Sequence, residues 1–507
     1  MIRPGVLALI AACTVGPTYH VPSAPVPKAA GYKEADGAGP WRPASPSDAM
    51  LRGDWWKIFH EPELDALEAK VDVSNQTIAQ SFANYMAARA QIGIARAQYF
   101  PTASVAPSVT TGRSSGSFSS TGVGSSTTGV VPGTTGTTIG GVNGRGVGGR
   151  FTTYSLPLEA TWAPDLFGRV RNTVRQAKYN AQVSAADLES QRLLEHATLA
   201  QTYFEIRGQD ALQRLLDDTV TADAAIAETA QARFDTGVDT EIAAVQAAQT
   251  LQTARVAATN AKLQRAQFEH AIATLIGVPA TAFAIPTRAR LATAPPIPLG
   301  TPSRLLERRP DIAAAERAMA AANAAVGVGY AAYYPDLTLT ASVGLQSNAI
   351  ASLFSWPSRV WALGATLAET IFDGGLRSAT IDQLVAQYDA TVAAYRQTVI
   401  AAFQNVEDQL SATRILAFEI DQQRTNVELA ERAFELEKTR YELGIDPYIN
   451  LMQQQGILLA AKQTLVTLQV QQMTSAVALI EALGGGWDKS ALPSADGTSA
   501  STRSRSP

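Results

Sequence analysis

The feature that most constrains this chain is an internal repeat. The stretch "ANYMAARAQIGIARAQYFPT" (83–102) aligns with "RAMAAANAAVGVGYAAYYPD" (317–336), and further shared signals follow each stretch in the same order. Gly277 and Gly484, for example, each end a helical pattern, as glycine commonly does. Because the order is kept through both halves, the sequence predicts two copies of one structural unit.

Each copy changes from a helical pattern to a strand pattern at an aromatic-proline corner. After the second corner, Leu337, Leu339, Ala341 and Val343 alternate with polar residues, so the period of the apolar residues falls from 3.6 to 2. Proline blocks continuation of the preceding helix. The two corners, which we interpret as the same junction in each half, consist of Tyr99, Phe100 and Pro101, and of Tyr333, Tyr334 and Pro335.

The repeated unit is predicted to be helix, strand, strand, helix, helix. Its segments in the first half are a helix over 62–98, a β-hairpin over 99–166 and long helices over 167–277. Its segments in the second half are a helix over 303–332, a β-hairpin over 333–373 and long helices over 374–485. A Pro-rich linker over 278–302 joins the halves, and a flexible tail over 486–507 follows them. The longest helical stretches could reach roughly 100 Å at about 1.5 Å per residue, so their apolar stripes need neighbouring helices.

The strands alternate as transmembrane β-strands do. In the second strand, Tyr154, Leu156, Leu158 and Trp162 share one face, which is typical of a strand with lipid on one side. Four strands in two separate hairpins need further strands to form a stable sheet. The Gly-, Ser- and Thr-rich segment 113–149 joins the first two strands and is predicted to be an extracellular loop.

The N-terminus has the form of a lipoprotein export signal. Arg3 precedes the apolar run "VLALIAA" (6–12), and the sequence "IAAC" ends at Cys13, the only cysteine of the chain. This arrangement predicts a signal peptide over 1–12 and a lipidated periplasmic segment over 13–61. The expected modification is covalent diacylglycerol and palmitate on Cys13, and no other cofactor is expected.

Composition and charge argue against several classes of function. The formal net charge is −4, so nothing indicates a nucleic-acid partner. The four histidines and the single cysteine are scattered, which argues against a metal cluster. No nucleophile and base occur in a pattern typical of an enzyme, and no apolar run approaches the roughly 18 residues of a transmembrane helix. A soluble alternative stays open at this point, namely a non-conducting periplasmic coiled-coil scaffold lipoprotein.

Six stretches of the chain belong together as a pattern. They are "CTVGPTYHVP", "APDLFGRVR", "RFDTGVD", "ERRPDIAAAERAMAAANAAVGVGYAAYYPDLTLT", "IFDGGLR" and "RYELGID". Together they resemble the TolC-like outer-membrane factor family of tripartite efflux pumps, in its NodT-like lipoprotein branch. The resemblance covers about residues 13–487.

The resemblance implies an α+β membrane protein that works as a homotrimer. Three chains of four strands would close one 12-stranded β-barrel in the outer-membrane lipid. The long helices would form a periplasmic α-helical barrel continuous with the β-barrel, and the linker and N-terminal segment would form an equatorial belt around it. A closed barrel also satisfies the rule that a sheet in a membrane has no free edge.

The resemblance also implies a function. The chain would be the outer-membrane channel of an efflux system of the resistance-nodulation-division (RND) type. It would passively conduct drugs or other small molecules that arrive from an inner-membrane RND-type transporter through a periplasmic adaptor, also called a membrane fusion protein. A type I secretion channel and a metal-efflux channel are the alternatives within the same class.

The glycine turns between the long helices are the implied functional positions. The adaptor-contacting tips would consist of Thr236, Gly237 and Val238, and of Leu443, Gly444 and Ile445. The candidate periplasmic gate would consist of Asn450, Met452 and Gln453. Related channels often carry aspartates at such gate positions, and this chain does not. Asp239 and Asp446 lie nearby, although acids in turns are commonly helix caps or solvated.

Overall fold

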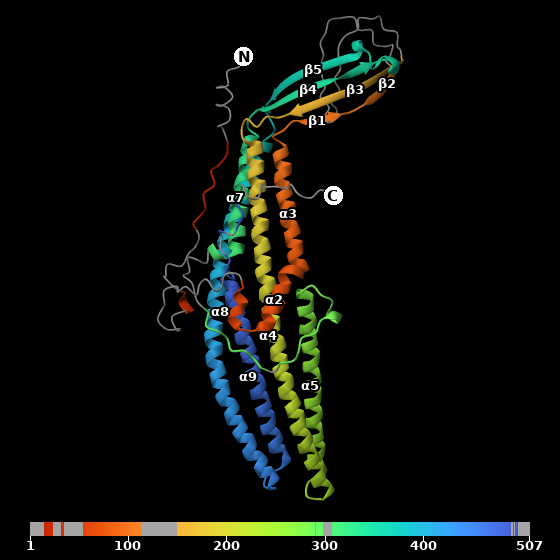
Figure 1. The fold of residues 1–507 in the computed structure, drawn as a ribbon. Helices are drawn as coiled ribbons and strands as arrows, with labels where there is room; N and C mark the ends of the chain where they lie inside the picture. Colours follow the sequence, from red (N-terminus) through yellow and green to blue (C-terminus); the bar gives the residue numbers. More distant parts are fainter. Residues whose placement is uncertain are drawn as a thin grey trace. The chain divides into compact units, whose positions relative to one another are not determined.

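The structure is a computed structural model that describes residues 15–23, 32–34, 54–113, 150–288, 290–297, 307–487, 490 and 492–494 (Figure 1). Its contacts divide the chain into two units. Unit 1 contains Met1–Val15, Arg96–Arg171 and Val328–Arg377, and unit 2 contains Gly16–Ala95, Asn172–Gly327 and Ser378–Pro507. Unit 1 holds the strands, and most helical residues belong to unit 2.

The sheet of unit 1 is antiparallel throughout and joins the two halves of the repeat. Its strands are β1 (Thr102–Val105), β2 (Ser108–Arg113), β3 (Arg150–Trp162), β4 (Asp336–Ser347) and β5 (Arg359–Ala368). β3 pairs with β4, so the hairpin of the first half lies beside the hairpin of the second half. The 3-10 turns η5 (Ile350–Ser352) and η6 (Trp356–Ser358) connect β4 to β5.

β1 and β2 form one interrupted strand rather than two. Both pair with β3 in a single register, which runs from Thr102 opposite Thr161 to Arg113 opposite Arg150. The interruption falls at Ala106 and Pro107, where proline has no N–H to donate to the ladder. The sheet therefore has the four strand positions that the sequence predicts.

The long helices have the same lengths in both halves. α4 (Arg169–Asp235) and α8 (Leu376–Glu442) have 67 residues each, and α5 (Glu241–Leu275) and α9 (Tyr448–Ala482) have 35 each. α4 and α5 form one helical hairpin, and α8 and α9 form the other (Figure 1). α5 and α9 are in contact. The remaining helical elements are η3 (Trp55–Phe59), α2 (Pro62–Ser74), α3 (Gln76–Ala97), η4 (Ala280–Ala282) and α7 (Pro310–Ala331).

The predicted helix over 62–98 is wrong in one respect, because it consists of two helices. The break between α2 and α3 falls at Asn75, whose backbone is extended. The Asn75 side-chain oxygen accepts hydrogen bonds from the N–H groups of Thr77 at 2.8 Å and Ile78 at 3.0 Å, which makes it the N-cap of α3. Its amide nitrogen donates to Glu195 on α4 and to the Leu275 carbonyl at the end of α5, at 2.9 Å each.

The predicted helix over 303–332 also differs from the structure. In the described part of the chain α7 begins at Pro310, since proline is suited to the first position of a helix, where no N–H donor is needed. Arg309 ties this start to α9, because its guanidinium donates to the Ala482 carbonyl at 2.9 Å. Residues 303–306 lie outside the described residues.

The two shorter helices of the long hairpins end against the backbone of other helices. Gly277, just after α5, has φ +68°, and a Cβ there would lie 2.1 Å from the Ser74 carbonyl oxygen at the end of α2. Gly484, just after α9, has φ +93°, and its Cβ would lie 2.1 Å from the Arg308 carbonyl oxygen. Only glycine combines a left-handed backbone with so close an approach. We call these two places the abutment sites.

The main apolar core of unit 2 lies around the abutment site of Gly277. η3 contributes Trp55 and Phe59 to this core, and α4 contributes Tyr203 and Phe204. Ile285 in the Pro-rich linker packs into the same cluster. The linker is therefore held by apolar burial even though it has little regular structure.

Candidate functional site

The sheet has one apolar face and one polar face. Residues directly opposite each other share a face, and one row across the sheet is Val105, Leu158, Val343 and Trp361. The next row on this face, closer to the strand ends that continue into the helices, is Ala103, Ala160, Ala341 and Leu363. The opposite face has rows of a different kind, namely Thr102, Thr161, Thr340 and Gly364, and Ser104, Glu159, Ser342 and Ala362. The register therefore confirms the predicted alternation.

The apolar face is exposed in the single chain. Trp361 and Leu363 are each 75% exposed, and Leu367 is 66% exposed. Leaving these large side chains in water is unfavourable by about 25 cal/mol for each Å² of exposed apolar surface. The face is suited to lipid, because an apolar band outside and polar residues inside are the arrangement of transmembrane β-barrels.

The aromatic-proline corners lie where the chain passes between helix and strand. Trp162 on β3 donates from its ring nitrogen to the Tyr99 carbonyl at 2.9 Å. Tyr334 stacks on Phe167 with ring centroids 4.8 Å apart, and the Arg377 guanidinium lies 5.0 Å from the ring centroid of Tyr333. Phe100 is exposed. The predicted corner residues thus gather at the end of the sheet where the strands continue into α3, α4, α7 and α8.

The two connections from a strand to a long helix, β3 to α4 and β5 to α8, each have an aspartate that caps the helix. Asp165 accepts hydrogen bonds from the backbone N–H of Arg171 at 2.9 Å and from its side chain at 3.1 Å. Asp373 accepts the equivalent pair from Arg377, at 3.2 Å and 2.6 Å. The Arg377 guanidinium holds the pKa of Asp373 below its usual range, with help from the backbone N–H of Gly375. An anion at a helix N-terminus is favourable, so "PDLFGRVR" and "FDGGLR" are two versions of one cap.

The two predicted tips have the same backbone geometry. Val238 N–H bonds to the Arg233 carbonyl and Gly237 N–H bonds to the Phe234 carbonyl, both at 2.9 Å. The corresponding bonds from Ile445 to Arg440 and from Gly444 to Tyr441 are also 2.9 Å long. This is the Schellman motif with glycine in the left-handed region, at φ +66° and +74°. Val238, Leu443 and Ile445 are exposed apolar side chains at these turns.

One arginine links the two tips. Arg233 at the end of α4 donates to the carbonyls of Tyr441 at 3.0 Å and Glu442 at 2.8 Å, which are the last groups of α8. Its guanidinium also lies 4.7 Å from the Tyr441 ring centroid. A cation at a helix C-terminus complements the helix dipole. Tyr441, Tyr448 and Leu451 pack with small residues of α4 and α5 beneath this contact.

The matching arginine of the second tip behaves differently. Arg440 forms an ion pair with Asp446 of its own turn, with 3.1 Å between Nη2 and Oδ1. The Arg440 side chain holds the pKa of Asp446 below its usual range. Asp446 is therefore paired rather than merely solvated, which the sequence did not indicate.

The candidate gate residues lie in the first turns of α9. Gln453 is exposed and Asn450 is half-buried. Met452 packs partly against the tip cluster of Tyr441 and Tyr448, so packing within the chain occupies part of its surface. Farther along α9, buried Gln455 donates to buried Asp223 on α4. Burial raises the pKa of Asp223 to about 6.

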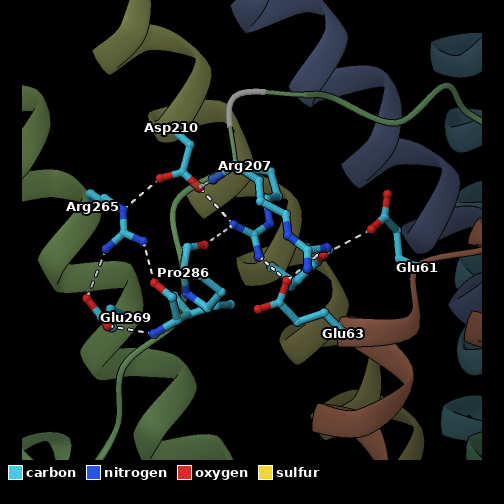
Figure 2. A network of polar contacts seen from close by, with 10 residues as sticks. Glu61, Glu63, Arg207, Asp210, Arg265, Glu269 and Pro286 are labelled. Carbon is cyan, nitrogen blue, oxygen red and sulfur yellow. Dashed lines mark hydrogen bonds and ion pairs between the residues drawn. The ribbon is translucent and has the colours of Figure 1, made fainter.

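A buried network of charges fixes the linker between the halves (Figure 2). Arg207 on α4 is 3% exposed and donates to Asp210 and to the Pro286 carbonyl at 2.8 Å each, and to Glu63 on α2 at 2.5 Å. Arg265 on α5 donates to the other oxygen of Asp210 at 2.6 Å. The linker, α2, α4 and α5 are therefore joined by two arginines and their acids.

A second buried pair lies between α2 and α4. His196 on α4 approaches Glu68 on α2 at 2.6 Å, and its ring stacks on Trp56 with centroids 4.7 Å apart. Burial raises the pKa of Glu68 to about 7, although the hydrogen bond from His196 opposes this shift. The pKa of His196 is raised as well, because the contacts with Glu68 outweigh the effect of burial. Sequence reasoning missed this pair, since the two residues are far apart in the chain.

No described helix combines the length and the hydropathy that crossing a bilayer would need. In the same part of the chain, no three His, Cys, Asp or Glu side chains are grouped so that they could hold a metal ion. Cys13 lies outside the described residues.

The chain is similar to proteins of known role. The family model described as outer membrane efflux protein matches residues 69–278 and 301–485. The "Antibiotic efflux pump outer membrane protein ArpC" of Pseudomonas putida is 31% identical over 482 residues, covering 94% of each chain. A second protein of the same species, the "Toluene efflux pump outer membrane protein TtgC", is 30% identical over the same length and coverage.

A solved structure has a similar fold. The CmeC outer membrane channel of Campylobacter jejuni superposes with a TM-score of 0.82. The match covers 94% of this chain and 96% of that one, at 22% sequence identity. At this identity the likeness concerns the fold alone.

Proposed function

Since the chain belongs to the outer membrane efflux protein family, we propose that it is the exit channel of a tripartite efflux pump of the RND type. The family and the fold confirm the predictions of a TolC-like fold, an outer-membrane location and a role in efflux. The relatives are channel proteins rather than enzymes or scaffolds. The alternative of a non-conducting scaffold lipoprotein therefore loses its support.

The observation that carries the proposal is the two-faced sheet with unpaired outer edges. Within the described strands, β5 pairs only with β4, and β1 and β2 pair only with β3. Free backbone groups at such edges are costly in lipid. Three copies would remove every free edge by closing a barrel of about twelve strands, because each chain supplies four strand positions and outer-membrane barrels are closed sheets. We therefore propose a homotrimer.

The polar face of the sheet supports passive conduction. In such a barrel this face would line the channel with threonine and serine rows and with Glu159. Small hydroxyl side chains offer water-like contacts without a shaped binding pocket. The relatives are named for antibiotics and for toluene. We propose drugs and other small organic molecules as the transported class, with selectivity supplied by the inner-membrane transporter.

The tips support a contact with a periplasmic adaptor. Val238, Leu443 and Ile445 present apolar side chains at both turns, and nothing lies within 4 Å of where a Cβ of Gly237 or Gly444 would be. A partner built of helical hairpins could pack directly on so open an apolar surface. We propose that these turns receive the adaptor, and that Asn450 and Gln453 just behind them form an uncharged gate.

The lipid anchor is a separate proposal. Cys13 follows an apolar run and ends a lipobox-like "IAAC". Diacylglycerol and palmitate on Cys13 would fix the N-terminal segment to the membrane, since two or more chains give stable anchoring. Intact mass spectrometry of the mature protein tests this. A mature N-terminus other than lipidated Cys13, or an unchanged mass in Cys13→Ser, would contradict it.

The channel function is tested by conductance and by drug export. The purified trimer in planar bilayers is expected to give ion-conducting openings, and expression with its adaptor and transporter should restore drug resistance to a host that lacks its own outer channel. Gly444→Trp is expected to abolish resistance and adaptor crosslinking while the protein still migrates as a heat-modifiable trimer. Full resistance in Gly444→Trp would show that the tip is misplaced, and a trimer that never conducts would refute the channel.

A further inference from the structure

The charged residues of the sheet are sorted by face and by height. Among the described side chains of the strands, the polar face carries the carboxylates Glu159 and Asp336. The apolar face carries two arginines. Arg359 pairs with Leu345 and is two residues from Trp361, so it shares the face of Trp361. Arg113 is two residues beyond Thr111 and shares its face. Each arginine lies at one end of its strand. This is the end opposite the one where the strands continue into the helices. In the described strands this face has no carboxylate.

Arg359 lies in an aromatic setting without an acidic partner. Its guanidinium carbon is 3.5 Å from the ring centroid of Trp356, which is itself 76% exposed. Phe354 and Trp361 are exposed beside it in the chain. Neither Arg359 nor Arg113 forms an ion pair with any described residue. A stacked guanidinium keeps its N–H groups free at the rim of the plane, and these groups fit the oxygens of a phosphate.

The height of both arginines matches the border of the hydrocarbon layer. Arg359 is eight residues from Leu367 at the helix-connected end of β5, which is about 27 Å along the strand. Arg113 is ten residues from Ala103, or about 33 Å along its strand. With strands tilted by about 40°, these lengths correspond to heights of roughly 20 to 25 Å, close to the apolar band of about 25 Å in such barrels.

An arginine on the lipid-facing side is costly in the middle of the bilayer and much less so at its border. Trp and Tyr favour the same depth, so Trp356 and Trp361 mark the border independently of the arginines. At this border in the outer leaflet, the anionic groups that meet the protein are the phosphates of glycolipids of the lipid A class. A fixed guanidinium and a phosphate complement each other in charge and in geometry.

We propose that Arg359 and Arg113 form a binding surface for the phosphate groups of a phosphorylated glycolipid in the outer leaflet. Arg359 is aimed by its stacking on Trp356 and binds one phosphate in bidentate fashion. Arg113, on the interrupted strand β1–β2, binds a phosphate of a lipid beside the other hairpin. The surface rests on the membrane insertion of the sheet and not on conduction, so conductance serves as an independent readout.

Binding of lipid A to the purified full-length trimer tests the proposal. Three probes are compared by native mass spectrometry and by titration in detergent, namely bis-phosphorylated lipid A, its fully dephosphorylated form and inorganic phosphate. Wild type is expected to retain bis-phosphorylated lipid A, with at least tenfold weaker binding of the dephosphorylated form. The double variant Arg359→Gln/Arg113→Gln should lose about tenfold in affinity for the bis-phosphorylated form.

The matched control is Arg96→Gln, which removes an arginine from unit 1 at the helix-connected end. Its affinity should stay within twofold of wild type, and the conductance of all variants should be unchanged. If the double variant fails to form a heat-modifiable trimer, Arg359→Lys replaces it and is expected to lose about threefold, since lysine keeps the charge but not the fork.

Three results would overturn the proposal. Equal affinity in wild type and in the double variant would exclude the two arginines. Equal binding of the phosphorylated and dephosphorylated lipids would reduce the surface to an apolar contact. Complete displacement of lipid A by inorganic phosphate at similar concentration would indicate a site for free phosphate rather than for a lipid headgroup.

Discussion

The abutment sites and the tips are built from the same local motif and have different surroundings. All four helix ends have a glycine with φ between +66° and +93° and the same pair of Schellman hydrogen bonds. At the abutment sites, Gly277 and Gly484 press on the backbone of another helical segment. At the tips, a Cβ added to Gly237 or Gly444 would have no neighbour within 4 Å.

The charged groups near these places differ in the same way. Arg207 and Asp210 lie on α4, which packs with the two helices that meet at the first abutment site, α2 and α5, and both residues are almost completely buried (Figure 2). Arg207 donates to Asp210 and to the Pro286 carbonyl. At the second tip the Arg440 side chain is 54% exposed, and it pairs with Asp446, which is half-buried and also contacts Glu437 on α8. The same helix-ending motif therefore allows close packing at the abutment sites and leaves an open surface for a partner at the tips.

The largest expected effect is the loss of the buried cation Arg207, which joins α4 to α2 and to the linker. Arg207→Ala leaves Glu63 and Asp210 without their shared partner, and breaking a buried pair on one side costs about 3–5 kcal/mol. Arg440→Ala is the matched change at the tip and should leave the thermal midpoint unchanged, because exposed pairs contribute little. Thermal unfolding of the detergent-solubilised trimer measures both. Equal shifts in the two variants would remove the distinction between the regions.

The next effect separates the glycines themselves. Gly277→Ala should destabilise by about 3 kcal/mol, since a left-handed alanine costs roughly 1–2 kcal/mol and overpacking typically adds about 1–3. Gly237→Ala carries only the first cost, because its Cβ meets open space. Chemical denaturation of the two proteins gives the difference. A Gly237→Ala protein as unstable as Gly277→Ala would show that the tip is also closely packed.

The buried pair of Glu68 and His196 predicts a pH dependence in the abutment region. A raised carboxyl pKa means that the folded state holds the proton of Glu68 where the unfolded state has lost it, so stability falls as pH rises from about 4.5 to about 7. The raised pKa of His196 acts in the same direction above pH about 6.5. Asp72 and Asp65 on α2 also face Glu68.

The free energy of unfolding is therefore expected to fall by an amount on the order of 2–3 kcal/mol between pH 5 and pH 8. The thermal midpoint should decrease over the same range. Glu68→Gln should flatten this dependence, because the amide does not titrate. His196→Gln keeps the carboxyl in its buried place and should leave the fall below pH 7 in place. A wild-type midpoint that rises across this range would contradict the assigned direction.

The smallest effect concerns the link between the tips. Arg233→Gln removes the cap of α8 and should destabilise its last turn by about 1 kcal/mol, or roughly fivefold in the rate of amide exchange. Arg440→Gln, on the matching arginine, should leave exchange at Tyr441 and Glu442 unchanged. Hydrogen exchange with mass spectrometry of the tip peptides measures both. The same increase in both variants would mean that the two arginines are equivalent.

The sequence alone determined much of this protein, because its strongest signals are local. The period of the apolar residues placed the long helices and the strands to within a few residues, and the alternation along β3 and β4 is the one the register shows. The aromatic-proline corners and the glycine ends were also predictable, since proline and glycine act through their own backbone. Asn75 had a local signal that was missed, because asparagine is a favoured N-cap.

Only the tertiary structure decided which of two equivalent residues does what. Arg233 and Arg440 occupy matching places in the repeat, yet one caps a neighbouring helix and the other binds its own turn. The Arg207 network and the Glu68–His196 pair join residues more than 75 positions apart. The same holds for Arg359, whose place on the apolar face follows from strand pairing. Local propensity fixes the elements, but burial and charge pairing are set by which elements pack together.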